Sequence, residues 1–524
     1  MALSGRLKPA LPLLPLLPAL VFPPLLIQML GDLHGGGLTL LSQFVVAAFQ
    51  PSLDPTVLSA QVTGLQITLI TALLSWSLSC VVGVLLGLIS SRTIWVLVSG
   101  TAGASRWISR LLSPLRSLHE LIWGLLLLQI FGLSSWVAVM AIALPYAALM
   151  ARVVADQIDS RDIPAMKALR SNGAGTIPTL ITALLPSFAE SLSHHMAHRL
   201  ECALRSALLL GVFGLGGLGT DLALSMQSLQ FNELWSGLWL LAMAMGSLEV
   251  LTHRLGVKLI GALILLAPGV GAGWGRLLAM DLSLPQLMLP LTDLSGSGAL
   301  NAAIEALPTA PWLTLIGSTI WLTALAAAVA IGGPPLGLLL WPGRYGVVVQ
   351  RVGWGLMRLF PPPLTALLLL LLAKPSLGLA AIALGLHHLG VMGRVLQDEL
   401  DSRSNATRTA MQCSGASQRL CWLYGDLAGA SRSYLAYAAY RMDVILRDTA
   451  VVALVGGAGL GWQLRESLTS FHWALVIWLV LAYALLTMAG EMVRERERVP
   501  WRDGERARER DREREIDRER EIER

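Results

Sequence analysis

The chain has 524 residues, of which 54% are hydrophobic and only 14% are charged, and its formal net charge is +5. Soluble chains carry about a quarter charged residues, so this composition excludes an ordinary soluble enzyme. So small a basic excess does not indicate a nucleic-acid-binding protein either. The apolar residues lie in long runs, which predict membrane-spanning helices of about 20 residues. We therefore expect an all-α polytopic membrane protein.

Twelve apolar stretches follow one another along the chain. In the first half they lie near 11–31, 63–90, 119–132, 135–155, 198–219 and 233–253. In the second half they lie near 257–274, 311–341, 360–373, 376–396, 440–461 and 472–490. The first stretch follows Arg6 and Lys8 and resembles a signal peptide, but its five prolines and the lack of a small-residue cleavage site favour a retained helix.

Basic residues in the loops predict the orientation. Pro9–Ser91 and Leu277–Gly343 contain no Lys or Arg. In contrast, arginines cluster in two corresponding loops, at Arg92, Arg106, Arg110 and Arg116 and at Arg344, Arg351 and Arg358. Because Lys and Arg in short loops mark the cytoplasmic side, we expect these loops and both termini in the cytoplasm, and the loops 32–62 and 275–310 outside. Arg276 lies on the wrong side in this scheme.

The second half of the chain repeats the first. A shift of 242 residues aligns Leu144–Leu222 with Leu386–Leu464 without a gap, and 22 of the 79 positions are identical. The identities include charges at fixed spacing, among them Arg152 with Arg394, Asp156 with Asp398, Arg199 with Arg441 and Arg205 with Arg447. An even number of spans per copy leaves both copies in one orientation, which predicts a parallel duplication. We divide the chain into 1–255, 256–490 and a charged tail, 491–524, which we expect to be solvated.

A polar stretch follows the fourth span of each copy, at 156–197 and 398–439. In the first copy Pro164 suits the first turn of a short helix, and Gly173 suits its end. Apolar residues then recur at helical spacing, which predicts a second helix. A helix, a glycine turn and a helix would form a cytoplasmic knob able to dock in a groove of a partner; an ordinary structured loop is the alternative.

This knob resembles the coupling loop of ABC importer permeases. The family pattern is Glu-Ala-Ala, three residues, Gly, nine residues and Ile-x-Leu-Pro. The first copy keeps the spacing, with Lys167-Ala168-Leu169, Gly173 and Ala183-Leu184-Leu185-Pro186. The second copy keeps less of it, with Thr409-Ala410-Met411, Gly415 and Gly425-Asp426-Leu427-Ala428. The resemblance implies that these loops seat in ATPase subunits, with coupling residues Lys167, Ala168, Gly173, Leu185, Pro186, Thr409, Ala410, Gly415 and Leu427.

Three stretches resemble phosphonate-type permeases in particular. They are Arg116–Trp123, which holds an Arg-x-x-x-Glu-Leu-x-Trp segment, Leu204–Gly211, which holds Arg-Ser-Ala, and the glycine-rich Gly214–Gly219. The implied fold is a tandem duplication of a type I ABC importer transmembrane domain, with about 12 helices. The implied function is import of phosphonate or a related small phosphorus oxyanion. Methionine-, thiamine- or iron-type import is the alternative within the family.

The same resemblance implies the partners and the location. Two cytoplasmic ATPase subunits would hold ATP and Mg, and a periplasmic or lipid-anchored binding protein would deliver the cargo. No cofactor and no metal is expected on this chain, and no Walker-type sequence occurs in it. The permease would lie in the bacterial inner membrane. A secondary transporter with two six-helix repeats is a further alternative, but apart from His387 and His388 the spans are poor in residues for ion coupling.

Two sets of residues are candidates for the translocation path, namely Arg205 and Arg447, and Gly214, Gly217, Gly219, Gly456, Gly459 and Gly461. A charge inside a span is costly and often functional, and two guanidinium groups can hold an oxyanion. However, Glu201 and Asp443 lie four residues before the two arginines, and an ion pair within each helix is the preferred interpretation. For the glycines, close helix packing is preferred over an unwound bend beside the pore. The four cysteines, Cys80, Cys202, Cys413 and Cys421, are predicted to be buried apolar residues.

Overall fold

The computed structural model describes residues 11–101, 103–159, 164–254, 256–278, 280–281, 301, 304–403, 406–452 and 459–492. These residues are helical almost throughout. The one extended pairing among them is an isolated antiparallel bridge between Leu33 and Ala373. Most of the predicted charged tail, from residue 493 onward, lies outside the described residues.

The helices of the first half are η1 (Leu11–Val21), α1 (Phe22–Gly31), α2 (Gly37–Ala47), α3 (Pro55–Ser90), α4 (Arg92–Ser99), α5 (Gly103–Ser117), α6 (Glu120–Phe131), α7 (Ser135–Asp159), α8 (Pro164–Ser171), α9 (Thr176–Thr179), η2 (Leu180–Leu184), α10 (Leu185–Leu210), η3 (Gly211–Leu215), α11 (Leu218–Gln227) and α12 (Phe231–Arg254). Those of the second half are α13 (Val257–Leu277), η4 (Leu307–Thr309), α16 (Trp312–Leu340), α17 (Arg344–Leu359), α18 (Pro362–Leu372), α19 (Leu377–Asp401), α20 (Ala406–Cys413), α21 (Gln418–Leu420), η5 (Cys421–Leu427), α22 (Ala428–Asp448), α23 (Leu460–Thr469) and a last helix, Trp473–Met492.

The chain is a multi-pass membrane protein. Among the described residues, eight helices are long and apolar enough to cross a membrane, and three bent helix pairs raise the number to 11. Helices α5 and α6 are bent by 85° relative to each other, and α17 and α18 by 102°. In the third pair, the continuous helix of η2, α10 and η3 is bent by 56° relative to α11. The remaining predicted span, 440–461, passes through residues 453–458, which the structure does not describe.

The sequence repeat is also a repeat of helices. The shift of 242 residues carries the bounds of α7 onto α19, those of α8 onto α20 and those of α11 onto α23. Backbone conformation repeats as well, because Gly173 and Gly415 have φ of +82° and +81°. The predicted tandem duplication is therefore confirmed in the described helices.

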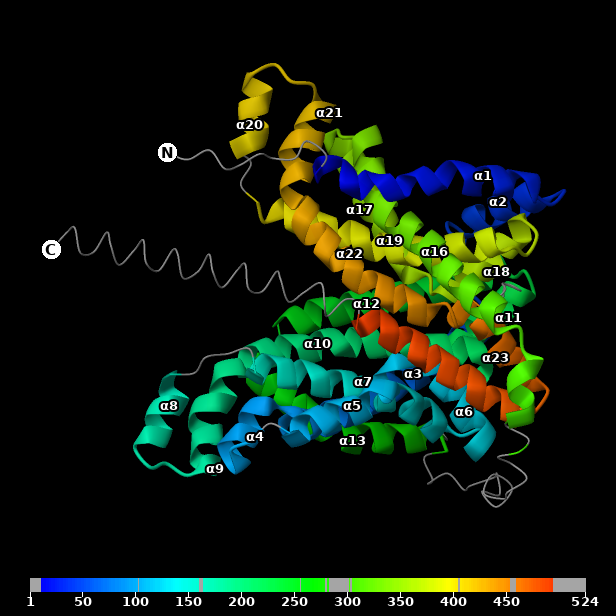
Figure 1. Ribbon diagram of the computed structural model, residues 1–524. Coiled ribbons are helices and arrows are strands. Elements are labelled where there is room, and N and C mark those ends of the chain that lie inside the picture. Colours follow the sequence, from blue (N-terminus) through cyan, green and yellow to red (C-terminus); the bar gives the residue numbers. More distant parts are fainter. Residues whose placement is uncertain are drawn as a thin grey trace.

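The first helix of each half packs against the other half. Helix η1 lies on α16, where a Cβ on Gly332 would come within 2.4 Å of the Ala19 amide nitrogen. Helix α13 lies on α3, where a Cβ on Gly271 would meet Leu74 at 2.6 Å. In Figure 1 the dark blue helix of η1 and α1 accordingly lies with the green and yellow helices of the second half, and α13 lies with the blue and cyan helices of the first half. The hydrophobic cores thus combine residues from both sides of the predicted boundary at 255/256.

The two halves also meet through their bent spans. Leu118 and Ile122, at the α5–α6 bend, pack in a core with α23 and the last helix. At the corresponding α17–α18 bend, Phe360 contacts Phe44 and Trp235 of the first half, with ring centroids 6.0 and 5.8 Å apart. Apolar contacts of this kind hold the two halves together at both bends.

The glycine run after α10 forms a bend, the alternative that the sequence favoured less than close packing. Gly214, Gly216 and Gly217 have φ of +89°, +90° and +85°, a region that glycine adopts without a Cβ penalty. Close packing is present too, because a Cβ on Gly219 would lie 2.0 Å from the Leu208 carbonyl oxygen. In the second half Gly459 has φ +120°, whereas Gly456 lies outside the described residues.

A threonine holds each bend in place. The Leu218 amide, at the start of α11, donates to Thr68 Oγ1 at 2.9 Å, and the Leu460 amide, at the start of α23, donates to Thr319 Oγ1 at 2.9 Å. All four groups are buried. Each hydroxyl satisfies an amide that the preceding bend leaves without a helical acceptor.

We expect Thr68→Val to lower the stability of the purified chain by about 1–3 kcal/mol, because the Leu218 amide would stay buried without an acceptor. The readout is the midpoint of thermal unfolding in detergent. Thr63→Val, on an exposed face of the same helix, is the matched control and should change stability by less than about 0.5 kcal/mol. Equal midpoints for the two variants would contradict the assigned role of Thr68.

Candidate coupling and translocation site

Two helical hairpins project from the same end of the helical bundle (Figure 1). In the first, α8 leads through a turn at Gly173 into α9, and in the second, α20 leads through Gly415 into α21. The amides of Ala174 and Ala416 donate to carbonyls five residues earlier, at 3.0 and 3.1 Å, which closes each helix with a left-handed cap. The short helix and glycine turn predicted for the first copy are confirmed, and the second copy repeats them.

The sequence predicted a separate second helix in each hairpin. In the structure the second arm of each hairpin is instead the start of a long helix. From Thr176 to Leu210 the chain runs through α9, the π-helical segment η2 and α10. From Gln418 to Asp448 it runs through α21, η5 and α22 in the same way. Because the helical backbone is continuous, a force on a hairpin is delivered along the helix that carries Arg205 or Arg447.

The residues predicted to couple lie on both arms of the hairpins. Lys167 and Ala168 lie on α8, Thr409 and Ala410 lie on α20, Leu185 and Pro186 begin α10, and Leu427 ends η5. Ala168, Thr409 and Ala410 are exposed, and so is Leu185. Leu427 is 0% exposed and belongs to the core of the second half, so its side chain packs inside the protein.

Each hairpin is anchored where the preceding span ends. The Asp159 carboxylate accepts hydrogen bonds from the first amides of α4, at 3.0 and 2.9 Å, and its counterpart Asp401 pairs with Arg351 at 2.9 Å. Within the second hairpin, Arg408 on α20 pairs with Asp426 on η5 at 3.0 Å. Burial raises the pKa of the Asp426 carboxyl. These contacts make each hairpin a braced unit and not a free loop.

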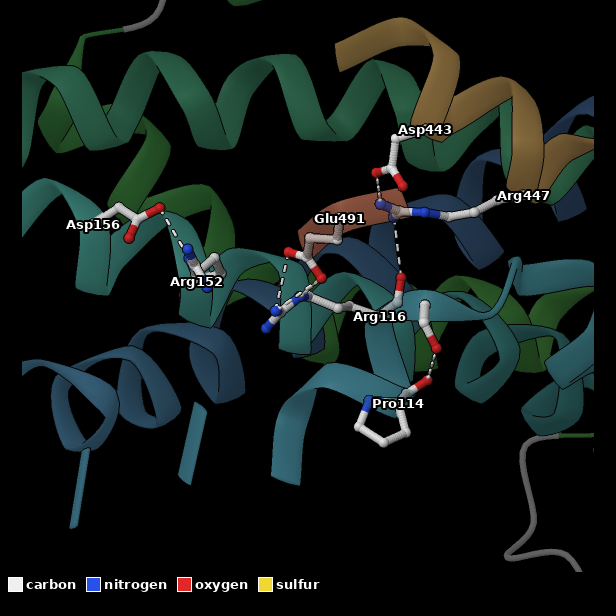
Figure 2. A network of polar contacts seen from close by, with 8 residues as sticks. Pro114, Arg116, Arg152, Asp156, Asp443, Arg447 and Glu491 are labelled. Atoms are coloured by element: carbon white, nitrogen blue, oxygen red, sulfur yellow. Dashed lines mark hydrogen bonds and ion pairs between the residues drawn. The ribbon is translucent and has the colours of Figure 1, made fainter. Parts of the chain in front are cut away.

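On one side of the interface between the halves, arginines are matched by carboxylates (Figure 2). Arg116, at the end of α5, donates from Nη2 to both carboxylate oxygens of Glu491 at 3.0 Å. The side chains of Arg116 and Glu491 are only 8% and 12% exposed. Arg447 pairs with Asp443 and donates to the Arg116 carbonyl at 3.0 Å. The predicted ion pair within this helix is confirmed, and the network joins the two halves.

The arginines that the repeat relates to Arg116 and Arg447 lack such partners. The shift of 242 residues carries Arg116 to Arg358 and relates Arg447 to Arg205. Among the described residues neither Arg205 nor Arg358 makes a hydrogen bond or an ion pair, and the Nε atom of each is buried without an acceptor. The predicted pair of Arg205 with Glu201 is therefore wrong. Arg447 also has an unpaired Nε, but both of its Nη atoms are engaged.

A cavity of about 90 Å³ lies between the two halves. Its polar lining consists of His119, Glu120, Arg205, Ser206, Arg358, His387 and Asp448. Both halves contribute to this lining, through α6 and α10 on one side and α17, α19 and α22 on the other. The cavity thus places Arg205, predicted for the translocation path, beside Arg358, which was not predicted.

The carboxylates of this cavity have partners. Glu120 accepts a hydrogen bond from Ser206 at 2.5 Å, and the Ser206 hydroxyl lies 2.8 Å from the Tyr146 hydroxyl. Asp448 lies between two imidazoles, 3.3 Å from His119 Nε2 and 3.1 Å from His388 Nε2. With His119 Nε2 3.6 Å from Glu120, a chain of polar side chains crosses the interface from α7 to α19.

Known proteins with similar sequences are permeases. The phosphate-import permease PhnE of Mycolicibacterium smegmatis is 23% identical over 461 residues, covering 81% of this chain and 83% of the relative. The phosphite transport permease PtxC of Stutzerimonas stutzeri is 29% identical over 123 residues, covering 24% and 45%. PhnE2 of Escherichia coli, named for phosphonate transport, is 25% identical over 118 residues, covering 22% and 97%. The chain is a homologue of ABC-importer permeases. It matches no family model and no solved structure.

The sequence of each single helix does not predict several residues of the permease cavity. His119, Glu120, Arg358 and Asp448 come together only because the halves pack against each other. One signal was available, since the shift of 242 residues places Asp448 where the first copy has Ser206. An ionisable residue within an apolar helical region is a candidate for a functional site.

The permease holds no cluster of metal-ligating side chains among its described residues. Cys80 and Cys421 are buried as predicted, but Cys202 is only partly buried and Cys413 is exposed at the end of α20. The prediction of four buried cysteines is therefore wrong for these two, because one lies at the tip of an exposed hairpin.

Proposed function

We propose that this chain is the translocation subunit of an ATP-driven importer for a small phosphorus oxyanion. Two cytoplasmic ATPase subunits bind its two hairpins, and a periplasmic or lipid-anchored binding protein delivers cargo to the opposite face. ATP and Mg are held by the ATPases. The observation that carries the proposal is the pair of braced hairpins at one end of a duplicated membrane fold, in a chain similar to named transport permeases.

The orientation is part of the proposal. The hairpins, the basic helices α5 and α17 and both termini lie in the cytoplasm of a bacterium, with the protein in its inner membrane. The basic residues of α5 and α17 support this side, because Lys and Arg accumulate in cytoplasmic segments. The two permease domains, 1–255 and 256–490, are the two copies of the duplicated sequence. In the folded chain, the first helix of each copy packs against the other copy.

The cargo class rests on the relatives. PhnE of Mycolicibacterium smegmatis is named for phosphate import, and the other relatives are named for phosphite or phosphonate transport. All of these anions carry a tetrahedral phosphorus with several acceptor oxygens, which guanidinium groups recognise well. Methionine-, thiamine- or iron-type import is not favoured, since none of these relatives is named for such cargo. A secondary transporter leaves the hairpins without a task.

The structure supports a mechanical route from ATPase to pore. Helix α10 has 26 residues, so it is about 39 Å long. It begins at the hairpin and carries Arg205 into the cavity before the glycine bend. When an ATPase closes on α8, a displacement of the hairpin therefore moves Arg205 and the bend together. The same relation links α20 to Arg447 in the second half.

The proposal is tested by placing a charge on each exposed docking face. Ala168→Glu and Ala410→Glu should each reduce the amount of ATPase that co-purifies with the chain by at least fivefold, because a buried unpaired charge opposes docking. Gln50→Glu, exposed on the connection after α2, is the matched control and should retain the ATPase. The proposal fails if both hairpin variants keep wild-type levels of ATPase and of phosphite uptake.

A further inference from the structure

The two copies of the repeat treat the arginines at the interface of the halves in opposite ways. Arg116 and Arg447 have acceptors in Glu491, in Asp443 and in a backbone carbonyl. Their counterparts Arg358 and Arg205 make no hydrogen bond within the described part of the chain, and the Nε of each is buried without a partner. Glu249 occupies the position equivalent to Glu491 but lies 3.7 Å from Arg394. A buried N–H group without an acceptor is costly, so the exception needs a reason.

The reason lies in what Arg205 and Arg358 face. Both line the central cavity of about 90 Å³, and both line a neighbouring one of about 330 Å³ between α10, α12 and α17. Arg358 also lines a third cavity, of about 280 Å³, which extends past Arg394 to Arg351 and Asp401 at the base of the second hairpin. Arg358 therefore stands where an interior site joins a polar path that ends beside a hairpin.

The size of the central cavity suits a small anion. Its volume of about 90 Å³ is several times the roughly 10–15 Å³ that one water molecule requires, which leaves room for a small tetrahedral anion. Leu208, Leu209 and Met245 are among the apolar residues that complete its wall. These side chains limit the size of what fits beside the arginines and keep the local dielectric low, which strengthens charge-assisted hydrogen bonds.

We propose that Arg205 and Arg358 together form a single binding site for a phosphorus oxyanion that retains one P–O–H group, at the interface of the two halves. This inference rests on the proposed function and names where the cargo pauses during transport. The anion oxygens accept from the two guanidinium groups, one from each half. Because Arg447 and Arg116 are neutralised, the site exists once per chain and not twice.

The carboxylates in the wall give the site its selectivity. Glu120 and Asp448 line the same cavity as the arginines. A hydrogen phosphite or hydrogen phosphonate anion offers a P–O–H donor to a carboxylate and acceptors to the guanidiniums. Sulfate offers acceptors only, so a carboxylate beside it is repulsive and unmatched. The site therefore discriminates between tetrahedral anions by the presence of a proton.

The test is direct binding of phosphite to the purified full chain in lipid nanodiscs, without binding protein or ATPase. We expect saturable binding of phosphite, and we expect Arg205→Gln and Arg358→Gln each to weaken its affinity at least tenfold. Sulfate should displace bound phosphite at least tenfold less well than phosphonate does. Arg358→Lys, which keeps the charge but not the fork of donors, should lose less than Arg358→Gln. Arg152→Gln, which breaks an exposed pair with Asp156, is the matched control and should bind as the wild type does.

The inference is overturned if the wild-type chain binds no phosphite, or if folded Arg205→Gln and Arg358→Gln bind it with unchanged affinity. Sulfate that competes as well as phosphonate overturns the assigned selectivity. The proposed function is judged separately, by the hairpin variants and ATPase co-purification. If the hairpin variants lose the ATPase while the chain alone binds no phosphite, the import function stands and the interior site does not.

Discussion

Glu491→Ala is expected to destabilise the folded permease by about 3–5 kcal/mol. The change removes the partner of Arg116, whose side chain is 8% exposed, and leaves a buried guanidinium without its carboxylate. The backbone carbonyl of Arg116 also receives the hydrogen bond from Arg447. Movement of Arg116 therefore disturbs the network that joins the two halves (Figure 2).

The measurement is the thermal unfolding midpoint of the purified full chain, together with the fraction that elutes as a monodisperse peak. Asp401→Ala removes the partner of Arg351 in an ion pair whose side chains are 46% and 60% exposed, and it should cost less than about 1 kcal/mol. The double change Arg116→Met and Glu491→Leu should recover most of the loss, because apolar replacement of a buried ion pair is often neutral. Equal unfolding midpoints for Glu491→Ala and Asp401→Ala would show that the buried ion pair contributes no more to stability than the exposed one.

Much of the fold follows from the sequence, because the solvent is a bilayer. A helix satisfies all of its backbone groups within one segment in hydrocarbon, so apolar runs such as those in α3 and α16 identify spans directly. The repeat then predicts α20 from α8 and α23 from α11, since shared charges fix the register. The glycine turns at Gly173 and Gly415 were predictable for the same reason, as they end short helices at equivalent positions.

Other features of the fold depend on packing that no single helix reports. The exchange of η1 and α13 between the halves is invisible to periodicity, since an apolar helix suits either neighbour equally well. The bends at α5–α6 and α17–α18, of 85° and 102°, join the predicted spans 119–132 and 360–373 to helices that were predicted from the sequence to lie in loops. The glycine run was ambiguous because small residues serve both close packing and a backbone turn, and here they do both.

The candidate site could be predicted only in part. Arg205 stands out as a charge in an apolar helix, and its cavity location agrees with that signal. Arg358 does not stand out, because it lies in the amphipathic helix α17 among other arginines and reaches the cavity only through the α17–α18 bend. The Glu201–Arg205 pair was a sound expectation from spacing, but the arginine turns toward the other half instead.

Gly219→Ala is expected to cost the permease about 3 kcal/mol or more, because an added methyl has nowhere to go. Its Cβ would lie 2.0 Å from the Leu208 carbonyl oxygen and 2.8 Å from the Val212 amide nitrogen, both of them backbone atoms. Rotation of a side chain cannot relieve such a clash, so α11 must separate from the end of α10. That separation opens the bend beside the cavity and should abolish phosphite uptake as well as lower the unfolding midpoint.

Two matched changes separate the clash from backbone strain. Gly216 has φ +90° but no atom within 4 Å of an added Cβ, so Gly216→Ala should cost only the left-handed strain of about 1–2 kcal/mol. Gly461, the counterpart of Gly219, would place its Cβ 2.9 Å from Ala450 Cα, so Gly461→Ala should be milder than Gly219→Ala. If the three variants unfold at one temperature, the close contact between α10 and α11 is not what positions the bend. If Gly219→Ala alone collapses, the glycine is required because two backbone segments touch there, and the pore-side bend depends on that contact.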